Sequence, residues 1–276
     1  MKTRFKPVAL TFHGSSFKVT HPKQFGLLNI PLPTSALEQV LEFSWKMTFG
    51  KQGQHRAYRT GGSEIRTDLM VFRDVYRGKL GEVAFYYYCQ QRPRVQQLSH
   101  IDFSCSGKGI WDCADFIVND EHHISIKTTK DFGNLLYLEA KDWEIDLLQH
   151  KTIYKPNQHD QSKNRGIYDY FFLCRVKSNI DAIIHQISQE PQPATLDDLK
   201  LKLFRILKLQ KPKLDIAGYI SNSDLYQVLQ QETFLLQAGT FVGKSAKPQD
   251  AENYYVQSGC MRPLMPWGSR PIQRSA

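Results

Sequence analysis

Two side chains, Asp115 and Lys127, are spaced so that they could act together on a phosphate ester. Asp115 opens a short apolar run at residues 116–118, which ends in a tight turn. The next segment, 122–128, alternates apolar and polar residues and predicts a second strand, which carries Ser125 and Lys127. If the two strands pair antiparallel, Asp115 and Lys127 lie at the same end of the hairpin.

A carboxylate beside a lysine suits metal-assisted hydrolysis of a phosphodiester. Asp115 would hold a hard cation such as Mg²⁺, which polarises the phosphoryl oxygen and supplies a nucleophilic water. Lys127 would orient that water or neutralise developing charge. Taken alone, Asp115 could cap a turn and Lys127 could be an edge-strand charge that blocks aggregation. The combination favours a catalytic site.

A helix is predicted just upstream, where Glu82 follows Gly81 in the apolar segment 82–88. With this helix and the hairpin, the chain resembles the PD-(D/E)XK nuclease superfamily, the restriction-endonuclease-like fold. That family places an Asp before an apolar strand and an acid-x-Lys on the next strand, often after a helix with a Glu. The matching positions are Asp115, Lys127 and Glu82. The resemblance covers 78–130 closely and 168–224 loosely.

The resemblance implies a Mg²⁺-dependent enzyme, for which Mn²⁺ could substitute. Asp115 and Glu82 would bind the metal, and Lys127 would position the water. Ser125 occupies the place of the acid expected two residues before the lysine. Serine is a poor Mg²⁺ ligand, so Glu82, Asp112 or a backbone carbonyl would have to compensate. In variants of the superfamily the helical Glu can take over.

A rival site lies a few residues on. Glu139-Ala140-Lys141 is a literal E-x-K, and Asp131 lies eight residues upstream of Glu139. Asp131 sits in a turn with no apolar strand of its own, and Glu and Lys two apart on a strand are common on exposed faces. We therefore favour Asp115 and Lys127.

The predicted elements form an α/β fold with a mixed central sheet flanked by helices, a restriction-endonuclease-like core. We expect one domain over 1–276, with its core at about 64–224 and with 1–60 and 239–276 as peripheral additions. Helices are predicted at 36–47, 82–88, 179–188 and 196–209. Strands are predicted at 114–118, 122–128, 135–138, 168–176 and 214–220.

The composition of the chain narrows the class of protein to which it can belong. The 276 residues are 41% hydrophobic and 23% charged, as in ordinary soluble domains. The sequence contains no run of 18 apolar residues, so we expect no membrane-spanning helix. No apolar segment follows the basic residues 2–6, so we expect no signal peptide. Five cysteines without a CxxC pair favour the reducing cytoplasm. No Walker-type phosphate loop is present, and no GxGxxG follows a strand.

The formal net charge of +9 favours a polyanionic partner such as nucleic acid. Residues 151–165 are polar and predict a loop whose donors suit base edges in a DNA groove. We expect Lys130, Lys155, Lys163 and Arg165 to contact DNA.

These observations predict a Mg²⁺-dependent, site-specific endonuclease of the type II restriction class, acting on double-stranded DNA as a cytoplasmic homodimer. One alternative is a DNA-binding protein with a nuclease-like fold that lost activity through the substitution at Ser125. Another is a structural protein that docks a larger assembly through its basic face.

Overall fold

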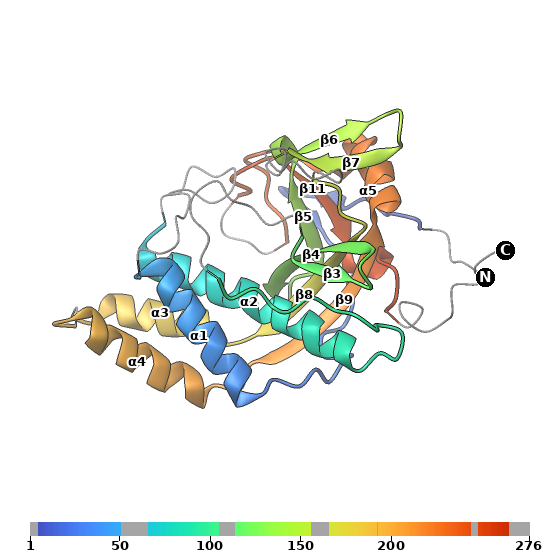
Figure 1. Ribbon diagram of the computed structural model, residues 1–276. Helices are drawn as coiled ribbons and strands as arrows, with labels where there is room; N and C mark the ends of the chain where they lie inside the picture. Colours follow the sequence, from blue (N-terminus) through green and yellow to red (C-terminus); the bar gives the residue numbers. More distant parts are fainter. Residues whose placement is uncertain are drawn as a thin grey trace.

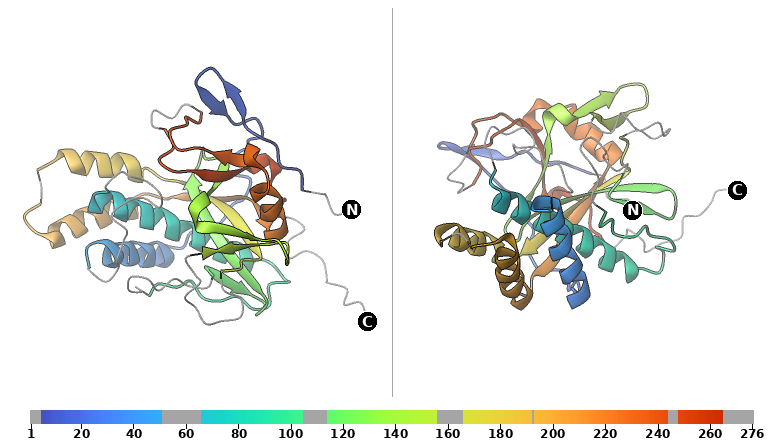
Figure 2. Two further views of the ribbon diagram at one scale, coloured as in Figure 1. Left: turned by 90° about the horizontal axis from the view of Figure 1, so that it is seen from above. Right: turned by 60° about the vertical axis from the view of Figure 1, so that its left-hand side comes forward.

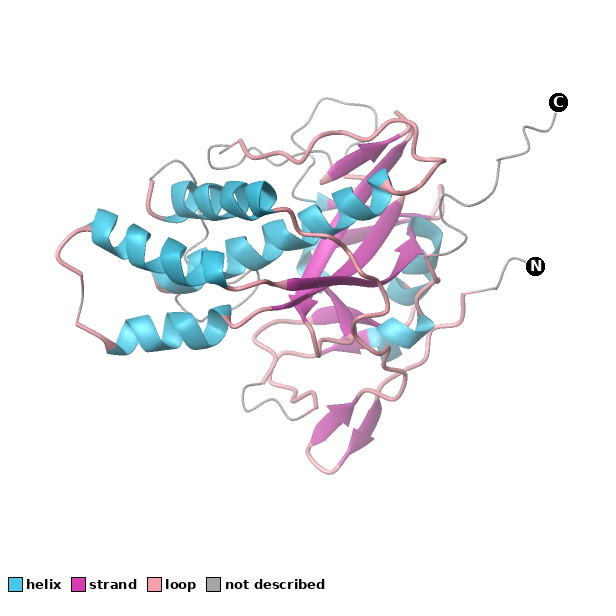
Figure 3. Ribbon diagram, turned by 90° about the horizontal axis from the view of Figure 1, so that it is seen from below, coloured by secondary structure: helices cyan, strands magenta, loops and turns pink. Residues whose placement is uncertain are grey.

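The computed structural model describes residues 5–50, 66–104, 114–155, 166–191, 193–243 and 248–264. The fold is mixed α/β, which confirms the predicted class. Helices α1 to α4 gather on one side of a central sheet, and the smaller sheets lie on the other side (Figure 1, Figure 3). No helix in the described ranges is both long and apolar enough to cross a membrane.

The central sheet has the order β3-β4-β8-β9. Its β3–β4 hairpin is antiparallel, β4 and β8 run parallel, and β8 and β9 are antiparallel. All four strands were predicted to within a few residues, because each is a short apolar run bounded by turn residues. They span Phe116–Val118 (β3), His122–Lys130 (β4), Tyr170–Lys177 (β8) and Lys213–Ser221 (β9).

Helix α2 (Asp68–Gln90) packs across β4, β8 and β9. It covers the sheet face that carries Ile124, Ile126 and Phe172, because alternate residues of a strand point to the same side. The other three helices build outward from α2 as a second layer. They span Thr34–Thr48 (α1), Ile180–Gln189 (α3) and Leu196–Leu209 (α4), as the sequence predicted to within a few residues.

The opposite face of the sheet, with Phe171, Leu173 and Ala217, packs on a second core. This core is built from helix α5 and a sheet of order β10-β11-β5. Only β5 was predicted from the sequence. The elements span Leu135–Glu139 (β5), Asn222–Leu229 (α5), Leu235–Leu236 (β10) and Asn253–Gln257 (β11).

Two further hairpins were not predicted. The first pairs β1 (Thr11–His13) with β2 (Ser16–Lys18), and Figure 2 shows it beside the C-terminal part of the chain. The second pairs β6 (Trp143–Asp146) with β7 (Lys151–Tyr154). The first four residues of the predicted loop 151–165 therefore form a strand instead.

Candidate active site

A cavity of about 530 Å³ lies between α2, β4 and β5. Its walls carry both acidic and basic side chains, and neither His nor Cys is among the lining residues. The acidic residues are Asp74, Glu82, Glu139, Asp142 and Asp250, and the basic ones are Arg66, Arg77 and Lys127. Two of the four residues proposed from the hairpin and helix, Glu82 and Lys127, thus line one cavity.

Asp115 lies at the edge of β4 because β3 is short. Three residues, 119–121, join β3 to β4, and Asn119 and Asp120 among them have positive φ, 53° and 55°, a conformation that Asn and Asp tolerate better than most residues. Beyond Ile124, β4 pairs with no strand on this side among the described residues. The Asp115 carboxylate takes the place of one, and its Oδ2 accepts the Ile126 N–H at 2.5 Å.

Glu82 is brought to the same place by a close contact between α2 and β4. A Cβ on Gly81 would overlap the side chain of Thr128, so only glycine allows this approach. Glu82 Oε2 accepts a hydrogen bond from Lys79 Nζ at 2.6 Å. Helix α2 and strand β4 therefore meet closely beside Glu82.

The pKa of Glu82 reflects this setting. Burial raises it to about 8, the neighbouring Lys79 opposes that rise, and the Asp115 carboxylate adds to it. The negative charge of Asp115 thus disfavours the ionised form of Glu82. A cation between them would relieve both the burial and the repulsion.

Lys127 and Ser125 differ in accessibility. Lys127 is partly exposed in the cavity and forms no hydrogen bond or ion pair with the described part of the chain. Ser125 is 1% exposed and does not line the cavity. The serine therefore presents no ligand there.

The fold places the three residues of the rival motif in different surroundings. Glu139 ends β5 and lines the cavity with Glu82 and Lys127. Lys141 lies in the following 3-10 helix (Ala140–Asp142), 60% exposed and 2.8 Å from Glu139. Asp131 lies in the turn after β4 and does not line the cavity. The cavity thus joins Glu139 to the favoured site rather than to a site of its own.

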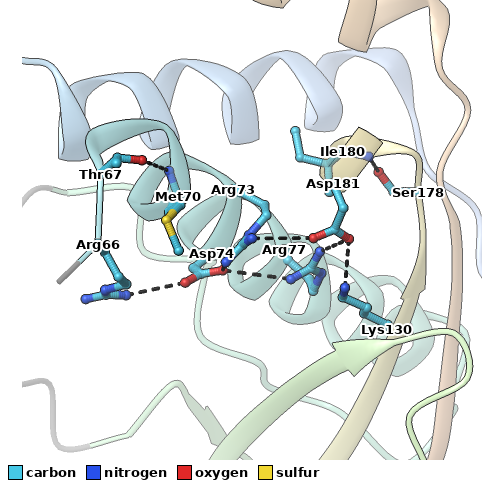
Figure 4. A network of polar contacts seen from close by, with 10 residues as sticks. All are labelled: Arg66, Thr67, Met70, Arg73, Asp74, Arg77, Lys130, Ser178, Ile180 and Asp181. Carbon is cyan, nitrogen blue, oxygen red and sulfur yellow. Dashed lines mark hydrogen bonds and ion pairs between the residues drawn. The ribbon is translucent and has the colours of Figure 1, made fainter. Parts of the chain in front are cut away.

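A network of charges runs along α2 at one side of the cavity (Figure 4). Arg77 is 2.7 Å from Asp181 on α3, and Lys130 on β4 is 3.2 Å from the same carboxylate. Burial alone would raise the pKa of Asp181, but Arg77 and Lys130 hold it below its usual value. Arg66 is 3.5 Å from Asp74, which also pairs with Arg73 at 2.8 Å.

The other predicted DNA contacts are spread out. Lys130 belongs to the network, and Lys155 is exposed just after β7. Lys163, Arg165 and the reserve ligand Asp112 lie outside the described residues. Sequence reasoning missed Arg66, Arg77 and Asp142, whose only signal was ordinary charge on predicted surface positions.

Mg²⁺, which the resemblance implies, fits this pair of carboxylates. Asp115 Oδ1 and Glu82 Oε1 make no hydrogen bond with the described residues, so each carboxylate keeps one oxygen for a cation. No three Asp, Glu, His or Cys side chains are grouped as metal ligands within the described ranges. A cation here would complete its shell with water and phosphate oxygens, as Mg²⁺ commonly does.

No protein-family model, curated protein or solved structure matches this chain. Its function is therefore inferred from the geometry and chemistry of the cavity.

Proposed function

We propose that the protein is a Mg²⁺-dependent endonuclease that hydrolyses phosphodiester bonds of double-stranded DNA. The observation that carries the proposal is that Glu82 and Lys127 line one cavity, while the Asp115 carboxylate, bound to the edge of β4, lies near enough to raise the pKa of Glu82. Bound Mg²⁺ would supply Lewis acidity and an activated water.

The chain's own residues would divide the remaining work. Asp115, fixed to the edge of β4 by its backbone bond, and Glu82, held by Lys79, would position the cation. Lys127 Nζ would donate to the attacking water or to a phosphate oxygen. Arg66 and Arg77 at the cavity wall would hold the neighbouring phosphates of the strand.

The proposed enzyme acts as a homodimer, so that two such cavities cut the two strands of a palindromic site. Site specificity would come from base contacts by loops.

Cleavage of phage DNA with varied Mg²⁺ tests the proposal. Wild type should give discrete fragments that EDTA abolishes, and both Asp115→Asn and Lys127→Ala should lose them, since each removes a group next to the reacting phosphate. Glu144→Gln, on an exposed position of β6, is the matched control and should cut normally. Cleavage that survives both site changes would overturn the assignment of these residues.

The second candidate is a DNA-binding protein without activity. The buried Ser125 favours it, because the position that should supply a metal ligand does not reach the cavity. This candidate predicts salt-dependent DNA binding with no cleavage at any Mg²⁺ or Mn²⁺ concentration. A structural protein that docks a larger assembly through its basic face would neither bind DNA strongly nor cleave it.

A further inference from the structure

The wall of the cavity opposite α2 carries two buried carboxylates that the nuclease site does not use. Glu139, at the end of β5, is 9% exposed, and Asp142, in the 3-10 helix that follows, is 7% exposed. Both line the cavity. They are three positions apart in the sequence, so both side chains come from one short segment of the cavity wall.

Asp142 has no compensation from the described part of the chain. Its carboxylate makes no hydrogen bond or ion pair there, although nine-tenths of the residue is buried. Glu139 pairs with Lys141, whose side chain is 60% exposed. Burying an ionised carboxylate without a partner is costly, so this wall favours a bound cation.

The chemistry of the wall selects the kind of cation. No His or Cys lines the cavity, which disfavours zinc and other cations that prefer nitrogen or sulfur. Carboxylate and amide oxygens are present instead, because Asn253 pairs with Glu139 across β5 and β11 and also lines the cavity. Oxygen ligands suit Mg²⁺ and Mn²⁺, and a cavity of about 530 Å³ leaves room for the waters that Mg²⁺ retains.

We infer that Glu139 and Asp142 form a binding site for a divalent cation, Mg²⁺ or Mn²⁺, on the wall of the cavity formed by β5. The site supplies the carboxylate ligands that β4 lacks at Ser125. This role for the cation rests on the proposed nuclease function, whereas the binding itself can be measured without DNA.

Titration of the metal-free, full-length protein with Mn²⁺, followed by the electron paramagnetic resonance of free Mn²⁺, tests the inference. Wild type should bind Mn²⁺, and Glu139→Gln and Asp142→Asn should each weaken binding about tenfold or more, since each removes a charged ligand. The matched controls Glu144→Gln and Asp131→Asn lie outside the cavity and should bind as wild type does.

Thermal unfolding of the same proteins checks that the variants fold and gives a second measurement. Mn²⁺ should raise the melting temperature of wild type and the controls more than that of Glu139→Gln or Asp142→Asn, because a ligand of the folded state stabilises it. Wild-type affinity in both cavity variants would overturn the inference. So would a loss of binding confined to Glu82→Gln and Asp115→Asn.

Cleavage assays on the same preparations separate the two proposals. Cleavage that depends on Lys127, together with unchanged Mn²⁺ binding by Glu139→Gln and Asp142→Asn, would overturn the cation site and support the nuclease. Mn²⁺ binding that requires both Glu139 and Asp142, in a protein that cuts no DNA, would support the cation site and overturn the nuclease.

Discussion

The position of Glu82 in the cavity wall strongly changes the ionisation of its carboxyl group. Burial raises its pKa from 4.5 to about 8, against the pull of Lys79. At pH 7 most of this carboxyl is therefore protonated in the metal-free protein. The unfolded chain has no such environment, and there Glu82 ionises near pH 4.5.

This difference predicts how stability depends on pH. Between pH 4.5 and 8 the folded protein keeps a proton that the unfolded chain has lost. The contribution of Glu82 is therefore complete below pH 4.5 and is lost as the pH rises through 8. Glu82→Gln should remove this slope, at most about 1.4 kcal/mol per pH unit, in urea unfolding curves recorded with EDTA. Glu144→Gln should keep it, and a Glu82→Gln curve parallel to wild type would contradict the assignment.

At the scale of elements, the contact between α2 and β4 depends on one of two glycines in the same helix. A methyl group on Gly81 would overlap Thr128, whereas one on Gly78 would meet no atom within 4 Å. Gly81→Ala should cost about 1–3 kcal/mol because it overpacks the contact. Gly78→Ala should be neutral or stabilise the helix by up to about 1 kcal/mol. Equal free energies of unfolding for the two variants would refute this account of the contact.

The charge network of α2, α3 and β4 predicts opposite effects on DNA binding. Arg77→Ala should weaken binding and lower the salt slope by about 1, because it removes a cation beside the cavity. Asp181→Asn should strengthen binding, since it releases Arg77 and Lys130 from their shared partner. Lys208→Ala, on α4 and paired with Glu38, removes the same charge elsewhere and is the control. Fluorescence anisotropy at several salt concentrations measures all three, and a tighter Arg77→Ala complex would exclude this role for the network.

How much the sequence could predict differs between elements. The strands of the central sheet and helices α1, α3 and α4 have apolar patterns bounded by clear turn signals, so they were predicted. Of α2 only 82–88 was predicted, although the helix spans Asp68–Gln90, because Gly78 and Gly81 resemble a turn signal before that segment. Strand β11, with Asn253 at its start, is short and lies in a turn-rich region, and its pairing with β5 is a long-range contact that no local pattern encodes. The position of Asp142 in the cavity depends on that pairing. For the same reason the two rival motifs appeared separate, although Glu139 lines the cavity of the favoured site.

Across the whole molecule, a buried ion pair ties the N-terminal segment to the central sheet. Arg175 on β8 is 0% exposed and pairs with Asp215 on β9 at 2.5 Å. Its guanidinium also donates to the carbonyls of Lys23 and Gln24, each at 2.6 Å. A single side chain thus satisfies backbone carbonyls of the N-terminal segment, and Lys23 lies 152 positions before it in the sequence.

Breaking this pair should be costly. Arg175→Met should lower the free energy of unfolding by about 3–5 kcal/mol, because it leaves Asp215 buried and unpaired. The double variant Arg175→Met, Asp215→Leu should lose less than the single variant, since the stranded carboxylate is gone. Urea unfolding measures both. A double variant at least as unstable as Arg175→Met would show that the charge is not the source of the cost.

The contact between residues 8–10 and β11 has a consequence for synthesis on the ribosome. The Leu10 N–H donates to the Tyr255 hydroxyl across 245 positions, and the Gln257 amide bonds to the carbonyls of Val8 and Ala9. Residues 8–10 therefore wait for partners on β11 that are translated about 245 positions later. A nascent chain arrested before β11 would expose the apolar side chains of Phe5 and Leu10, and it would be a substrate for chaperones rather than a stably folded protein.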